Sequence, residues 1–202
     1  MKHAVILAHP NPRSVNAALA GGFAGALRAF GHTVIVRDLY AIGFDPCLHA
    51  DELPWAADYA PRADVLAERE ALADVEAFTL VYPFWFNAPP AMLKGYVDRV
   101  FGFGFGYGPG PGGTVPLLTG RSLFSISTSG APDQWVARTS ALTDLRHTFD
   151  AHVADVCGLA VLDHLHFGGV TPGVRPDVVE TMIAVARDAA HCHFADVADA
   201  LS

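Results

Sequence analysis

Short strand-like runs alternate with longer amphipathic segments along the chain, and this alternation restricts the fold more than any other feature. The short runs cover residues 4–8, 33–36, 78–82, 122–127 and 159–167. The run at 4–8 is continuously apolar, as expected for a central parallel strand that is covered on both faces. We therefore predict five strands.

The segments after these runs carry apolar side chains at helical spacing. They cover residues 15–30, 64–73, 89–101, 135–156 and 177–201, and a proline-interrupted, irregular excursion lies between 39 and 61. The last segment has an apolar stripe made of Val178, Met182, Val185, Ala189 and Val197. Five strand–helix repeats predict an α/β fold, a five-stranded parallel sheet with helices on both faces, and the flavodoxin-like order is the simplest topology.

Composition limits the possible partners and the location. The net charge is −8 and the basic residues are scattered, which argues against nucleic acid or an anionic membrane as the main partner. No apolar stretch approaches the roughly 20 residues needed to span a bilayer. Three widely spaced cysteines match neither a disulfide framework nor a zinc site, and the apolar run at the N-terminus is too short for a secretion signal. We expect a cytoplasmic protein.

The chain is expected to form one domain over residues 1–202, because no repeat or linker interrupts it. Hydrophobic residues make up 51% of the sequence, more than a lone globule of this size needs. This excess favours a buried subunit interface and hence an oligomer.

The loop after the first strand is suited to a phosphate. Ser14 is a good helix N-cap, and the helix that starts at Val15 offers free N–H groups and the positive end of its dipole. Asn16 adds a neutral donor, and His9 or Arg13 supplies charge. The alternative is a plain capped helix start.

The loop after the third strand is aromatic. Phe84, Trp85 and Phe86 follow Pro83 directly and cannot all face inward, so one or two of them are expected in the crevice at the sheet edge, with Asn87 beside them. There the rings would flank a planar heterocycle while backbone groups read its edge. The alternative is an aromatic cluster that caps the core.

The loop after the fourth strand is made of small residues, Thr128, Ser129, Gly130 and Ala131. Small side chains let the backbone approach a flat ligand, and the hydroxyls add donors. Because ligands of such sheets bind beyond the carboxyl ends of the strands, the three loops should meet. A phosphate end, a ring edge and a ring face together fit flavin mononucleotide, FMN.

Five stretches resemble the NAD(P)H:quinone oxidoreductase family of flavodoxin-fold proteins, which includes DT-diaphorase. They are residues 7–16, residues 38–46, the segment YPFWFNAPPAMLKGYVDRVF at 82–101, residues 125–130 and residues 157–162. The resemblance implies a flavin, contacted by the loop residues named above, and a homodimer with the flavin at the interface. It also implies that Tyr107 contacts the acceptor, in a segment that often reaches over the partner subunit's site.

One departure from that family concerns catalysis. Trp135 stands where DT-diaphorase-like members have a Tyr that stabilises charge, and Ala141 stands where they have a His. Trp donates one N–H but cannot relay protons, so we assign Trp135 a stacking role; a core tryptophan is the alternative. Hydride transfer still requires mainly orientation.

The function predicted from these residues is the transfer of two electrons from NAD(P)H to an acceptor in two steps. NAD(P)H delivers hydride to the flavin and leaves, and a quinone or similar flat acceptor takes its place, in an apolar slot walled by Phe86, Phe105, Tyr107 and Trp135. The glycine-rich run at 102–108 would form a flexible lip, or alternatively an ordered loop. Rival functions are a flavodoxin-like electron carrier and a redox-sensing regulatory flavoprotein.

Two further predictions concern cofactors. The segment Leu53–Arg62 is shorter than in FAD-binding relatives, which favours FMN over FAD. His164 and His166 share one face of the last strand, but no third ligand has suitable spacing, so we predict no metal site.

Overall fold

The computed structural model describes residues 1–195 and contains one five-stranded parallel sheet in the order β2-β1-β3-β6-β7. The strands are β1 (Lys2–Leu7), β2 (Thr33–Asp38), β3 (Ala77–Pro83), β6 (Ser122–Thr128) and β7 (Ala160–Phe167). The order reverses between β1 and β3, which is where a doubly wound sheet opens a crevice. The predicted fold class, a five-stranded flavodoxin-like parallel sheet, is confirmed.

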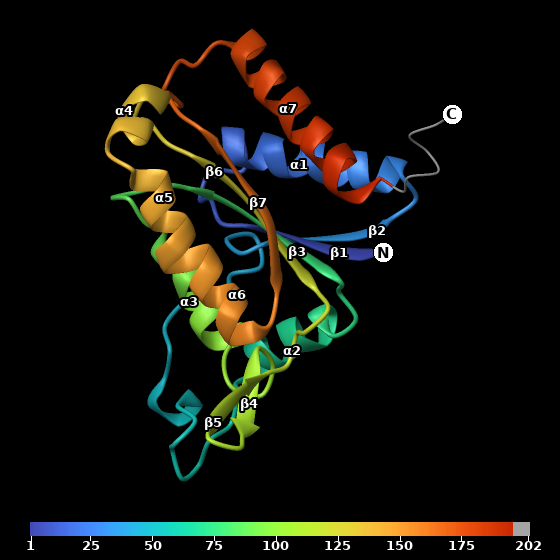
Figure 1. Cartoon of the computed structure of the whole chain (residues 1–202), viewed down its shortest axis with the longest axis vertical. Coiled ribbons are helices and arrows are strands. Elements are labelled where there is room, and N and C mark those ends of the chain that lie inside the picture. The colour runs from blue at the N-terminus through green and yellow to red at the C-terminus, as the bar shows by residue number, and fades with distance from the viewer. Residues whose placement is uncertain (196–202) are drawn as a thin grey trace.

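Helices cover both faces of the sheet (Figure 1). On one face lie α1 (Val15–Ala29) and α7 (Pro176–Phe194). On the other face lie α2 (Ala63–Leu72), α3 (Ala91–Val100), α5 (Ala141–Leu145) and α6 (His152–Cys157), and α4 (Asp133–Arg138) follows β6. No helix within residues 1–195 has both the length and the apolar character needed to cross a bilayer.

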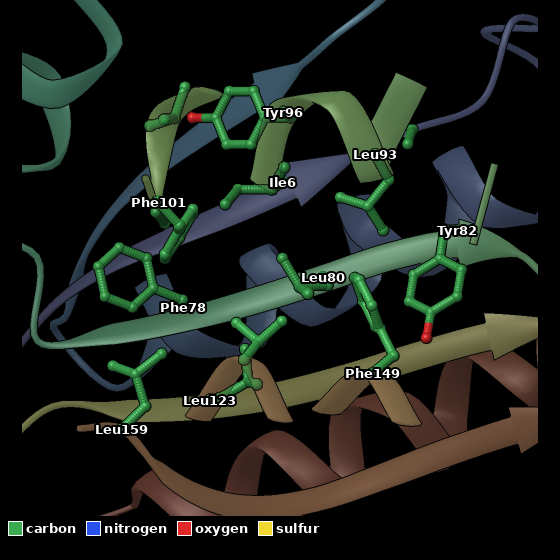
Figure 2. Close-up of a cluster of buried hydrophobic side chains, with 14 of the residues drawn as sticks. Ile6, Phe78, Leu80, Tyr82, Leu93, Tyr96, Phe101, Leu123, Phe149 and Leu159 are labelled. Atoms are coloured by element: carbon green, nitrogen blue, oxygen red, sulfur yellow. The ribbon is translucent and has the colours of Figure 1, made fainter. Parts of the chain in front are cut away.

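The core on the α3 side is the larger and the more aromatic. Figure 2 shows its buried side chains between the sheet and the helices, with Phe78, Leu80 and Tyr82 projecting from β3. Tyr82 and Phe149 lie edge to face with ring centroids 6.1 Å apart. Alternate residues of β3 thus fill one core and the remaining ones fill the other, as a buried central strand requires.

One expectation about the helices needs correction, and another lies partly outside the described residues. The closing helix ends at Phe194, and residues 196–201 of the predicted helix lie outside the described residues, as does Val197. Val178 and Val185 are exposed; the buried face of α7 is formed by Met182, Ala186, Ala190 and Phe194. Of the predicted stripe, Met182 is buried and Ala189 partly buried, whereas Val178 and Val185 face outward, since alanines form much of the face that packs on α1.

The segment predicted as one or two helices, residues 135–156, forms two: α4, and a continuous helical stretch made of α5, a π-helical turn and α6. Between α5 and α6 the chain forms a π-helical turn, η2 (Arg146–Ala151). A π turn inserts one extra residue into the helical repeat and is frequent at functional sites. Its effect here is to direct Asp150 inward, where its side chain is buried.

The glycine-rich run at 102–108 leads into an antiparallel hairpin, β4 (Tyr107–Gly110) and β5 (Gly113–Pro116). The hairpin stands at the amino-terminal end of β6, away from α4, as Figure 1 shows at the lower end of the molecule. The run is therefore an ordered connection to this hairpin. It does not form a lip at the crevice of its own chain.

The irregular excursion between β2 and α2 is held by one buried cation. The Arg99 side chain of α3 is fully buried, and its guanidinium donates to Glu52 at 2.9 Å and to Asp64 at 2.7 Å. It also donates to the carbonyl oxygen of Asp45 at 2.5 Å. Bidentate charge-assisted bonds of this kind fix geometry, so the 3-10 turn η1 (Ala50–Glu52) is fastened to α3.

The close approach of Gly95 to this excursion gives a test of the packing. A Cβ on Gly95 would overlap the backbone carbonyl of Pro46, whereas a Cβ on Gly21 of α1 would meet nothing within 4 Å. Gly95→Ala should lower the free energy of unfolding by roughly 1–3 kcal/mol through overpacking. Gly21→Ala should raise it by about 0.5–1 kcal/mol through helix propensity. Urea unfolding of both variants measures the difference; equal effects would contradict the packing described.

Candidate active site

A cleft of about 430 Å³ lies at the carboxyl ends of β1, β3 and β6. Four segments contribute to its wall, the three predicted loops and the segment after β7. The cleft is lined by His9, Asn11, Arg13, Ser14, Val15, Asn16, Pro83, Trp85, Thr128, Ser129, Gly130 and residues 170–174. The three loops therefore meet, since the carboxyl ends of parallel strands share one edge of the sheet.

The loop after β1 is shaped by its own polar side chains. The Asn11 backbone N–H donates to His9 Nδ1 at 3.0 Å, and the Arg13 N–H donates to Asn11 Oδ1 at 2.9 Å. Ser14 caps α1 by accepting from the Ala17 N–H at 3.1 Å. The N–H groups of Val15 and Asn16, at the start of the helix, remain available for an anion.

Charge near this helix start comes from Arg13 rather than from His9. Burial lowers the pKa of His9, so that its ring is neutral at physiological pH. Arg13 is exposed and lines the cleft. The His9 ring lies 5.8 Å from the Trp85 ring, and together the two rings form an apolar wall beside the polar helix start.

Asn16 joins the first loop to the third. Its side chain is only 2% exposed, and Asn16 Nδ2 donates to Thr128 Oγ1 at 2.9 Å. Asn16 Oδ1 is buried and has no hydrogen-bond partner among the described residues. A buried acceptor without a donor costs stability, so this atom points to a ligand that donates to it.

The aromatic triplet divides into three environments. Phe84 is buried and packs edge-on against His166, with ring centroids 5.6 Å apart. Trp85 is half-exposed and lines the cleft, while the Phe86 side chain is 106% exposed. The Phe84 N–H donates to the carbonyl oxygen of Thr128 at 2.6 Å, so the second and third loops lie side by side.

A tight turn sets these orientations. Trp85 and Ala88 exchange backbone hydrogen bonds of 3.1 and 3.0 Å, with Phe86 and Asn87 between them at φ +50° and +56°. Left-handed backbone is unfavourable for residues with a Cβ and especially so for a bulky side chain. Strain of this kind gathers at functional sites, where another contact compensates it.

The other predicted residues lie outside the wall of this cleft. Ala131 is half-buried just beyond it, and Trp135 is partly exposed on α4. Phe105 packs on the core, and Tyr107 borders two hollows of about 180 and 210 Å³ near the end of α3. A slot with Phe86, Phe105, Tyr107 and Trp135 as its walls is not formed within one chain.

Sequence reasoning missed the fourth wall of the cleft. The Val170 N–H donates to the Ser129 carbonyl at 2.8 Å and the Gly169 N–H to that of Ala131 at 2.8 Å, which seats the segment after β7 on the third loop. The signal was present, because this segment follows a fifth strand that ends at the same edge.

The fold and site together define a doubly wound α/β protein with a polar cleft at its topological switch point. The chain belongs to the family with the flavodoxin-like fold, whose sequence model matches residues 1–191.

Two relatives and one solved structure extend the comparison. The chain is 32% identical over 171 residues to an uncharacterized NAD(P)H oxidoreductase of Haemophilus influenzae, covering 84% of this chain and 85% of that protein. It is 26% identical over 202 residues to NAD(P)H dehydrogenase (quinone) 1 of Cavia porcellus, covering 89% and 72%. An NAD(P)H:quinone oxidoreductase from Methanothermobacter marburgensis superposes with a TM-score of 0.81 at 25% identity, covering 94% and 95%. The predicted resemblance to NAD(P)H:quinone oxidoreductases is confirmed.

Relief of the strained turn is a direct test of its geometry. Phe86→Gly should raise the free energy of unfolding of the ligand-free chain by roughly 0.5–1 kcal/mol, since glycine accepts a positive φ and the exposed ring loses no packing. Asn87→Gly should give a smaller gain, because Asn tolerates this conformation better. Thermal and urea unfolding measure both variants, and a loss of stability in Phe86→Gly would contradict the turn described.

Proposed function

We propose that this protein is a flavin-dependent NAD(P)H oxidoreductase that passes two electrons by ping-pong hydride transfer to a quinone or a similar flat acceptor. The observation that carries the proposal is the cleft where the Ser14-capped helix, the Trp85 loop and the Thr128–Gly130 turn converge. The relatives named as NAD(P)H oxidoreductases and quinone reductases support the same class of enzyme.

The residues of the cleft fit a flavin nucleotide. The free N–H groups at the start of α1 and the Arg13 guanidinium suit a phosphate, which a helix dipole also favours. The unpartnered Asn16 Oδ1 suits a hydroxyl or ring N–H donor of the ligand. Trp85 and His9 suit the flat face of an aromatic ring system.

The flavin, when bound, supplies the chemistry of accepting and passing on a hydride. The chain's own residues bind and orient. In the proposed assignment Ser14, Val15 and Asn16 hold the phosphate end, Pro83 to Asn87 line the ring system, and Thr128 to Ala131 read its polar edge. We favour FMN over FAD because the segment Leu53–Arg62 is short.

We further propose a homodimer in which Tyr107 of one copy reaches the cleft of the other. Within one chain Phe86 and Trp135 stand exposed near the cleft, while Tyr107 stands at the far end of the sheet. A groove of about 210 Å³ with Val97, Val153 and Val156 in its wall runs beside Tyr107, an apolar surface of the kind that dimers bury. The free thiols of Cys47, Cys157 and Cys192 agree with a cytoplasmic location.

Flavin binding and turnover test the function. After incubation with FMN or FAD and gel filtration, the protein should retain a yellow chromophore, and mass spectrometry of the released compound identifies it. Asn16→Asp should weaken flavin binding at least about 100-fold, since it replaces a donor by a buried charge beside the phosphate. Gln134→Glu, the same change on the exposed surface of α4, is the control. No retained flavin, or no NAD(P)H oxidation with any quinone, would reject the proposal.

Mixing two inactive variants tests the shared site. Asn16→Asp damages the site of its own chain, and Tyr107→Ala damages the site of the other chain. A mixture refolded in equal amounts should recover about a quarter of the activity, because half of the dimers are mixed and each has one intact site. Sedimentation gives the oligomeric state. A monomer, or no recovery on mixing, would contradict the cross-subunit role of Tyr107.

A further inference from the structure

A continuous line of hydrogen bonds connects the buried interior with the cleft. Asp150 Oδ2 is 2.5 Å from His164 Nδ1, and His164 Nε2 is 2.7 Å from Ser127 Oγ. Ser127 Oγ is 2.8 Å from His166 Nδ1, and His166 Nε2 is 2.9 Å from Ser129 Oγ. Five side chains from η2, β6 and β7 and the turn after β6 thus form one continuous path.

One arrangement of hydrogens pairs every group of this path. Where the Asp150 carboxylate only accepts and each imidazole carries one hydrogen, His164 donates from Nδ1 and accepts at Nε2. Ser127 has a single hydroxyl hydrogen, which it gives to His164, so His166 must donate to Ser127 from Nδ1. His166 then accepts at Nε2 from the hydroxyl of Ser129.

The outer end has two available orientations. Ser129 Oγ lies 2.9 Å from His166 Nε2 and 3.1 Å from the carbonyl oxygen of Ala131, and its one hydrogen serves only one of them. When Nε2 of His166 carries a proton, Ser129 accepts from it and donates to Ala131. The hydroxyl can therefore reverse without leaving a group unpaired, which is the property that passing a proton requires.

Both ends of the path open to a hollow. Ser129 lines the cleft at the strand ends. Asp150 lines a separate hollow of about 330 Å³ beside α5 and η2, together with Thr143, Arg146 and His147. Asp150 reaches both the hollow and His164 because the π-helical turn η2 directs it inward.

The charged and titratable groups that face the path come from several elements. Burial and the neighbouring His164 lower the pKa of His166 to about 4, and Asp133 of α4 opposes this. Tyr82 of β3 packs against His164, and burial raises its pKa, so its phenol is uncharged. Asp163 accepts from the His164 backbone N–H and pairs with Arg146, and Phe84 covers His166.

We propose that the path Asp150–His164–Ser127–His166–Ser129 relays protons between solvent in the hollow and the reacting groups in the cleft. The proposal rests on the function proposed above. Reduction of a quinone consumes NAD(P)H and one proton and yields NAD(P)⁺ and a quinol. The nicotinamide C–H bond breaks and supplies both electrons and one hydrogen, so one proton must still reach the cleft.

The relay supplies that proton without net change in the chain. In the arrangement that delivers, Asp150 has taken a proton from solvent through the hollow, and both imidazoles carry their hydrogen on Nε2. Ser129 then gives its hydroxyl proton to the cleft and takes one from Nε2 of His166, whose Nδ1 takes one from Ser127. Ser127 takes one from Nε2 of His164, whose Nδ1 takes the proton of Asp150, and the row is left in the resting arrangement. Every O–H or N–H bond broken along the path is formed again one step further out.

Two serines of β6 allow an experiment that distinguishes a proton relay from a purely structural hydrogen-bond network. Ser127 is in the line, whereas Ser125 is a side branch whose hydroxyl donates to Asp150 Oδ1 at 2.9 Å. Both are buried and both project from β6. Ser127→Ala cuts the path, while Ser125→Ala removes an equivalent buried hydroxyl and leaves the path whole.

The first experiment compares kcat of the flavin-loaded variants across pH. Ser127→Ala should lower kcat on the order of tenfold to a hundredfold above about pH 8, where free protons are scarce, with an increased solvent isotope effect. Ser125→Ala should follow the unchanged protein. Flavin affinity should agree within about threefold in all three, and imidazole added to the buffer should restore part of the loss. Equal profiles for both variants, or a loss of activity that follows a loss of flavin, would overturn the relay.

A second variant and a second measurement guard against misfolding. Asp150→Asn keeps the shape of the side chain and should give the same loss at high pH if Ser127→Ala fails to fold. In the flavin-free chain, nitrogen-15 spectra of the histidine rings should show His164 and His166 protonated on Nδ1 at neutral pH. Protonation of His166 on Nε2 would contradict the path. If the flavin-loaded protein without substitutions does not oxidise NAD(P)H with any quinone, the proposed function is rejected, and the relay with it.

Discussion

The backbone pairing of β3 with β6 is the interaction on which the site depends. These two strands pair in register from Ala77↔Ser122 to Pro83↔Thr128, and the ladder continues one step further through the bond from the Phe84 N–H to the Thr128 carbonyl. A slip of one residue would turn every side chain of β6 to the opposite face. Ser125 and Ser127 would then face α1 and α7, and the aromatic loop would part from Thr128. The cleft and the polar path within the core are thus consequences of one register.

Much of the fold could be predicted from the sequence because its signals are local. Apolar runs indicate the strands, and the N-cap residue Ser14 indicates that a helix starts at Val15. The three loops could be assigned to one edge because the topology of a parallel sheet requires it. The helical character of residues 135–156 could be predicted, whereas the π turn η2 within them could not, because it depends on a tertiary contact, the inward placement of Asp150. The different exposure of Phe84, Trp85 and Phe86 could not be predicted either, because it depends on the positive φ of Phe86 and Asn87.

The polar path could have been predicted from the two-residue periodicity of β6 and β7, but only the histidines of β7 were considered. His164 and His166 were recognised as sharing a face of the last strand, and as unsuited to a metal. Ser125 and Ser127 share a face of β6 by the same period of two. The register sets Ser125 opposite His164 and Ser127 opposite His166. Read together, the two strands place alternating hydroxyls and imidazoles in a buried row, a pattern that costs desolvation unless every member is paired. The partner at its inner end, Asp150, comes from the helical segment that connects these two strands.

A single chain builds the polar half of the cleft more completely than the apolar half. The helix start, Asn16 and the Thr128–Gly130 turn are fixed by hydrogen bonds and by burial. Phe86, by contrast, projects into solvent from an unfavourable backbone conformation, and the β4–β5 hairpin, which begins with Tyr107, lies at the other end of the sheet. A fold does not retain an exposed ring on strained backbone for its own stability, since glycine there would serve better. The imbalance is resolved if the apolar half of the site is completed by what covers Phe86, a bound ring or a second copy of the chain. The polar half, including the serine and histidine row, belongs to the chain alone.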